Sequence, residues 1–161
     1  FDLLIIGNNF IYHLYGFCYN VFMIKFVWTK KYSVGIKSID EQHQHFFEIT
    51  NSLVEMSLNV TATKEELIGL LDGLGNYALY HLGNEENYFD KFHYPDAPMH
   101  VEEHNKFREK IQKFFDSIRD EKVDVPKLAE EAAIYSGNWL FHHILLIDKK
   151  YTKFFQEHNI K

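Results

Sequence analysis

The chain has 161 residues, a length typical of one domain with a substantial hydrophobic core. Its net charge of −6, pI near 5.9 and scattered Lys and Arg residues argue against a nucleic-acid partner. The one cysteine, Cys18, excludes a disulfide framework and a CxxC metal site, and it fits a reducing compartment, so we expect a cytoplasmic protein.

The first 22 residues differ from the rest of the chain. They contain no Lys or Arg, and they combine Asn residues with many aromatic residues. Polar residues interrupt any transmembrane helix there, and neither the basic start nor the cleavage site of a secretory signal is present. We therefore expect residues 1–22 to be non-native or upstream sequence, or else the end of a linker or membrane-anchored region. Residues 23–161, starting at Met23, form the expected domain.

The first half of the domain predicts an irregular arm followed by two helices. The arm covers residues 28–38, and the first helix covers residues 39–58. Thr63 opens the second helix, with Glu66 three residues later as a capping box, and the helix runs to residue 91. Four glycines weaken this second helix by about 1 kcal/mol each relative to alanine, but its apolar periodicity continues through them.

The second half predicts two further helices. Pro98 suits the first turn of a third helix that reaches residue 121, and Pro126 begins a fourth that ends near residue 156. Short connections between long helices favour antiparallel neighbours. The predicted fold is therefore all-α, an up-down-up-down antiparallel four-helix bundle with an irregular N-terminal arm.

Polar residues interrupt the apolar stripes of these helices at inward positions. The second stripe ends in His81 and Glu85, and the third begins with His100 and His104. Residues four apart share one helix face, so each pair presents two donor atoms to one small region. The first stripe contains His43 in the same way. Alone, His43 would be interpreted as a hydrogen-bonded core histidine, and a single His-x-x-x-Glu pair as a surface pair.

The fourth helix is less regular. His143 lies on its apolar stripe, whereas Asp148 is five residues later, which in an α-helix corresponds to a rotation of about 140°. By itself Asp148 would be a solvated residue. Periodicity places His45, His142 and Glu86 on outward faces.

Together the four helices supply seven candidate ligands to one buried centre. Imidazole and carboxylate donors suit iron, zinc, copper or nickel, and a set of seven exceeds the need of one ion. No Glu-x-x-His or His-Glu-x-x-His motif occurs, so a ferritin-like site and a zinc protease lose support. The candidate ligands are His43, His81, Glu85, His100, His104, His143 and Asp148.

The chain resembles the hemerythrin family, in particular its single-domain bacterial members, over residues 26–155. The matching motifs are Trp28 with Gly35; Ile39-Asp40-Glu41-Gln42-His43; Tyr80-His81 with Glu85-Glu86; Tyr94-Pro95 before His100 and His104; and Trp139-Leu140 with His143-Ile144, Asp148 and Tyr151.

The resemblance implies two non-haem iron ions with a bridging oxo or hydroxo group. One iron would be bound by His100, His104 and His143, and the other by His43 and His81, with an open position for dioxygen. Glu85 and Asp148 would bridge the two ions. The implied partner is dioxygen, with possible delivery to an oxygen-consuming enzyme, and the oligomeric state is left open.

Reversible oxygen binding needs a site that excludes water and acid. We expect several apolar residues near the ligands to form such a pocket. They are Phe46, Phe47, Leu82, Phe107, Trp139 and Ile144. The resulting hypothesis is oxygen storage, transport or delivery by a protein that is not an enzyme. Oxygen or redox sensing, reduction of peroxide or nitric oxide, and iron storage are the alternatives.

Overall fold

The computed structural model describes residues 5–6, 9–10 and 25–159. Two short strands, β1 (Ile5–Ile6) and β2 (Asn9–Phe10), pair antiparallel. The other residues of the predicted upstream segment 1–22 lie outside the described residues, as does Met23.

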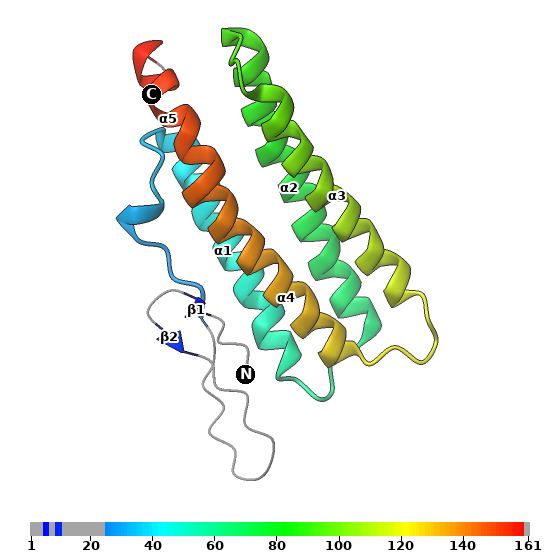
Figure 1. Cartoon of the computed structure of the whole chain (residues 1–161). Coiled ribbons are helices and arrows are strands. Elements are labelled where there is room, and N and C mark those ends of the chain that lie inside the picture. Colours follow the sequence, from blue (N-terminus) through cyan, green and yellow to red (C-terminus); the bar gives the residue numbers. More distant parts are fainter. Residues whose placement is uncertain (1–4, 7–8, 11–24, 160–161) are drawn as a thin grey trace.

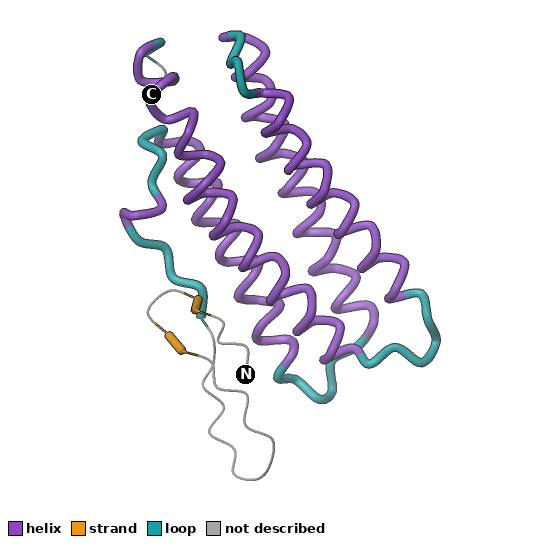
Figure 2. Tube along the Cα trace, in the orientation of Figure 1, coloured by secondary structure: helices purple, strands orange, loops and turns teal. Residues whose placement is uncertain are grey.

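Four long helices packed antiparallel form the body of the molecule, with α1 beside α4 and α2 beside α3 (Figure 1). Short loops join them (Figure 2). The fourth helix continues without a break through a π-helical segment, η2, into α5. The bounds are α1 Lys37–Ser57, α2 Lys64–Phe92, α3 Ala97–Ile118, α4 Val125–His142, η2 His143–Asp148 and α5 Lys149–Glu157. The predicted all-α bundle is confirmed, and α3 ends three residues earlier than predicted.

Local sequence signals account for where the helices begin and end. Thr63 accepts a hydrogen bond from the Glu66 backbone N–H, and the Glu66 carboxylate accepts one from the Thr63 N–H, which completes the predicted capping box. Pro98 lies in the first turn of α3, as predicted. At the end of α2, His93 adopts a left-handed conformation with φ of 54°. These termini set the short loops that make the helices antiparallel neighbours.

The core consists of two apolar clusters separated along the bundle by a polar layer. The larger cluster contains Phe46, Leu82 and Phe107, and the smaller one contains Ile39 and Phe89. On α1 the buried residues between Ile39 and Phe46 are Gln42 and His43, and on α2 the buried residue between Leu82 and Phe89 is Glu85. Each fully buried apolar side chain stabilises the fold by about 1.5–3 kcal/mol, so the two clusters can hold a polar layer that is costly to bury.

The N-terminal arm includes the short 3₁₀ helix η1 (Lys30–Tyr32) and lies along α1 (Figure 1). Asn51 on α1 fixes the start of the arm, because it accepts a hydrogen bond from the Phe26 N–H (2.8 Å) and donates one to the Phe26 carbonyl (2.9 Å). The Phe26 ring packs directly over Gly137 of α4, where a Cβ atom would be 2.1 Å from the ring. Only a glycine permits this close approach of the arm to the bundle.

Among the described residues, no helix combines the length and the apolar character that crossing a bilayer requires.

Candidate metal centre

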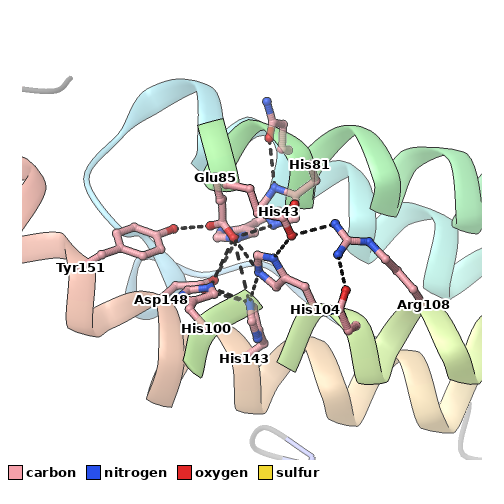
Figure 3. A network of polar contacts seen from close by, with 12 residues as sticks. His43, His81, Glu85, His100, His104, Arg108, His143, Asp148 and Tyr151 are labelled. Atoms are coloured by element: carbon pink, nitrogen blue, oxygen red, sulfur yellow. Dashed lines mark hydrogen bonds and ion pairs between the residues drawn. The ribbon is translucent and has the colours of Figure 1, made fainter. Parts of the chain in front are cut away.

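Seven buried polar side chains meet in the layer between the two apolar clusters, and Figure 3 shows them pointing toward one another. None is more than 3% exposed. All seven predicted ligand residues lie in this layer. They are His43 from α1, His81 and Glu85 from α2, His100 and His104 from α3, and His143 and Asp148 from η2.

One group of donors consists of three histidines and Glu85. The Nε2 atom of His143 lies 3.2 Å from Nε2 of His100 and 3.1 Å from Nε2 of His104. Glu85 Oε2 lies 3.2 Å from Nε2 of His104. Two ligand atoms about 2.1 Å from one ion lie about 3.0 Å apart at a right angle and about 3.4 Å apart at the tetrahedral angle. The observed separations therefore fit donors that face a single ion.

The second group consists of His43, His81 and again Glu85. Asp148 connects the two groups through its separate oxygens. Its Oδ2 lies 3.2 Å from Nε2 of His43, and its Oδ1 lies 3.0 Å from Nε2 of His143. Each carboxylate thus contacts both groups, as a carboxylate that bridges two ions must do.

Hydrogen bonds within the protein leave several atoms of this layer unsatisfied. Nε2 of His43, Nε2 of His81, Oε2 of Glu85 and both carboxylate oxygens of Asp148 are buried without a hydrogen-bond partner. An unsatisfied buried polar group costs about 1–3 kcal/mol, and more if it is charged. Lone pairs that converge from five nitrogens and two carboxylates fit bound cations, which would offset this cost.

The π-helical segment explains how Asp148 joins the cluster. In an α-helix, a residue five positions after His143 is rotated by about 140° and would lie away from it. Residues His143–Asp148 instead form a π-helix, in which the hydrogen bonds link residues five apart. Both side chains are consequently buried and within 3.0 Å of each other. The solvated placement that α-helical spacing favours for Asp148 alone is wrong.

Without a bound ion, the histidines of the cluster differ in the direction of their pKa shifts. Burial lowers the pKa of His81 to about 3. Burial acts in the same direction on His143, but Asp148 and Glu85 outweigh it and raise the pKa of His143 to about 9. The surrounding histidines hold the pKa values of Glu85 and Asp148 well below their usual range despite burial. Both carboxylates are therefore ionised and ready to bind a cation.

Outer hydrogen bonds orient three of the candidate ligands, and sequence reasoning assigned none of them. Gln42 Oε1 lies 3.0 Å from Nδ1 of His81. Glu86 Oε1 lies 2.8 Å from Nδ1 of His104, so the prediction that Glu86 simply faces outward is wrong. The Tyr151 hydroxyl donates to Oε1 of Glu85 (Figure 3). Because the amide and carboxylate oxygens accept, each Nδ1 carries the proton and each Nε2 keeps a lone pair for the cluster.

Aromatic rings border the cluster on the side of the larger apolar core. Trp139 stacks on His143 with ring centroids 4.2 Å apart, and Phe107 lies 4.2 Å from Trp139. Phe46 packs against both of these rings. Phe47 lies elsewhere, against Trp28 of the arm, and Trp28 in turn lies 6.0 Å from the ring of His43.

The other two predicted pocket residues, Leu82 and Ile144, are fully buried in the same core. The histidines assigned to the surface, His45 and His142, are exposed, as predicted.

Fold and site together define a cation-binding four-helix bundle with a buried cluster of imidazole and carboxylate groups. A hemerythrin HHE cation binding domain matches residues 34–155. The chain belongs to the hemerythrin family, and its buried cluster is consistent with a di-iron site.

Individual relatives agree with this assignment. A bacteriohemerythrin of Clostridium acetobutylicum is 30% identical over 128 residues, which is 78% of this chain and 98% of that protein. A hemerythrin-like protein of Naegleria gruberi is 28% identical over 126 residues, which is 78% of this chain and 90% of that protein. A crystal structure of a hemerythrin mutant matches with a TM-score of 0.66 at 24% identity, covering 79% of this chain and 94% of that one. This last likeness shows a shared fold.

Proposed function

We propose that this protein binds dioxygen reversibly at a non-haem di-iron centre, for oxygen storage, transport or delivery. The observation that carries the proposal is the pair of shared carboxylates. Glu85 belongs to both donor groups, and the two oxygens of Asp148 face histidines of different groups. Two such carboxylates suit a dinuclear centre far better than two independent ions. Two ferrous ions in it would supply the electrons and the coordination position that dioxygen requires.

The two donor groups differ in the number of histidines, and this supports the proposal. His100, His104 and His143 would hold one ion, whereas the other has only His43 and His81. With the carboxylates shared, the second ion would have one protein ligand fewer. This difference leaves room for a small exogenous ligand on the side of His43 and His81.

The rings beside the centre support binding rather than turnover. Phe46 and Phe107 are fully buried, and Trp139 stacks on His143, so these rings cover the layer on the side of the larger apolar cluster. None of these three rings offers an acidic proton. A wall that offers no acidic proton to a bound ligand favours its release unchanged over its reduction.

The test is the visible absorption spectrum of the iron-loaded protein. Protein reduced with dithionite, freed of excess reductant and kept under nitrogen should be nearly colourless. It should gain visible charge-transfer absorption in air and lose it under vacuum. Direct passage to a stable ferric spectrum would refute reversible binding and favour a sensor or a reductase of peroxide or nitric oxide. Iron binding below two ions per chain would refute the di-iron centre itself.

A further inference from the structure

Two candidate ligands from different donor groups have outer partners of different charge. His104 donates through Nδ1 to the carboxylate of Glu86 at 2.8 Å. His81 donates through Nδ1 to the side-chain amide oxygen of Gln42 at 3.0 Å. The two hydrogen bonds have similar lengths and occupy the same position on the imidazole, so they differ chiefly in that one acceptor is anionic and the other neutral.

Glu86 is held in place from the neighbouring helix. Arg108 of α3, which is labelled in Figure 3, donates from Nη2 to Oε1 of Glu86 at 2.8 Å, and from Nη1 to Oδ1 of Asn105 at 2.9 Å. The side chains of Glu86 and Arg108 are 29% and 26% exposed, so water shields this ion pair only in part. The guanidinium fixes the carboxylate at the imidazole and keeps it ionised.

The charge of the acceptor affects the opposite nitrogen of the ring. A carboxylate that accepts from Nδ1–H increases the electron density at Nε2 and makes the imidazole a stronger donor to a metal. An amide oxygen does the same more weakly, because its hydrogen bond is not charge-assisted. His104 is therefore a better ligand than His81, apart from any difference in the number of histidines.

We infer that Glu86 is a positioning residue that strengthens metal binding selectively at the His100, His104 and His143 group, whereas Gln42 leaves the His43 and His81 group as the weaker and more exchangeable position. This inference rests on the proposed dinuclear centre and adds the order in which its two positions fill. The group with Glu86 binds its ion first and releases it last.

The test is a titration of the metal-free protein with Co²⁺ under nitrogen, in competition with a chelator. Wild-type protein should bind two ions in separate steps. Glu86→Gln keeps the shape of the side chain and removes its charge. It should weaken the tighter step by about 10–100-fold, the range seen when outer partners of metal ligands are changed. The dissociation constant of the weaker step should change far less, so the dissociation constants of the two steps become more similar.

The converse substitution, Gln42→Glu, distinguishes an effect on metal affinity from a structural role. Gln42→Glu puts a carboxylate on His81 and should strengthen the weaker step by about tenfold or more. A gain in affinity cannot arise from a residue that only holds helices together. The matched control is Glu48→Gln, which removes a carboxylate from Nδ1 of the exposed His45 at the same 2.8 Å distance. It should leave both steps unchanged.

Two sets of results would overturn the inference, and they are distinguishable. If wild-type protein binds two ions and Glu86→Gln shifts both steps equally or neither, Glu86 does not make the positions unequal. If wild-type protein binds fewer than two ions, the dinuclear centre fails and the inference fails with it. Should Glu86→Gln not fold, as judged by far-ultraviolet circular dichroism, Gln42→Glu decides alone, because an unchanged weaker step contradicts the inference.

Discussion

Replacing Asp148 with asparagine tests whether a shared carboxylate joins the two ions. Asp148 Oδ1 lies 3.0 Å from Nε2 of His143, and Oδ2 lies 3.2 Å from Nε2 of His43. The substitution Asp148→Asn preserves shape but turns one oxygen into an NH₂ group, which has no lone pair for a metal. One of the two contacts is therefore lost, and the second ion should be lost with it.

The expected loss of stability follows from binding linkage. A free metal concentration 100 times the dissociation constant stabilises the fold by about 2.7 kcal/mol for each site. In a chain of this size, 1 kcal/mol shifts the melting temperature by about 2–4 °C. Asp148→Asn should therefore reduce the rise in melting temperature on metal addition by about 5–11 °C under these conditions, and reduce the metal content from two ions to one or none.

Thermal unfolding followed by circular dichroism, with and without added Zn²⁺, measures this increment. The difference between the two melts is compared, since it removes any effect of the substitution on the metal-free protein. The matched control is Asp116→Asn, which neutralises an exposed carboxylate far from the cluster. A variant at Asp148 that retains two tightly bound ions and the wild-type increment would refute the bridging role.

Three further outcomes follow from the structure. Trp139→Leu opens the wall beside His143, so the iron-loaded protein should pass irreversibly to the ferric form faster in air, and an unchanged rate in the visible spectrum would argue against a protective wall. Thr63→Ala removes the capping box of α2 and should destabilise the fold by about 1 kcal/mol, or about 2–4 °C in a thermal melt. The metal content should stay unchanged, and any loss of bound metal would contradict a purely local effect. Without an ion the pKa of His143 is raised to about 9, so this histidine is protonated at pH 7 and must release its proton to bind a metal. Zn²⁺ affinity should therefore rise between pH 7 and pH 9, with proton release measurable in weak buffer; an affinity independent of pH would contradict the protonated state.

The helices and most of the cluster could be predicted because they depend on periodicity alone. A spacing of four residues places His81 with Glu85, and His100 with His104, on one face of a helix whatever the neighbouring helices do. The apolar residues before His81 and those after His104 then fix which face is inward. Predicting that these four side chains meet needed only the antiparallel order of the helices, which the short loops supply.

Glu86 could not be placed in the same way. It follows Glu85 directly, and adjacent residues on an α-helix are about 100° apart, so periodicity directs Glu86 away from the stripe. Its actual partners, His104 and Arg108, are both on α3 and one turn apart. Whether Glu86 faces solvent or this seam depends on how far α2 is rotated about its own axis against α3. That angle results from packing of the whole core and leaves no signal in the local sequence.

The π-helix also resolves a conflict that the sequence contains but does not explain. His143, Asp148, Tyr151 and Phe155 are all buried, yet in a continuous α-helix the eight residues from His143 to Tyr151 would leave these two side chains about 80° apart. The π-helical segment holds one residue more than an α-helical turn, and this brings Asp148, Tyr151 and Phe155 back to the inner face. The same extra residue thus puts Asp148 beside His143, Tyr151 against Glu85 and Phe155 in the smaller apolar cluster. One extra residue therefore permits all three buried contacts. Both the packing of the smaller apolar cluster and the contacts within the buried polar cluster favour the π-helix, because a continuous α-helix would form neither set of contacts.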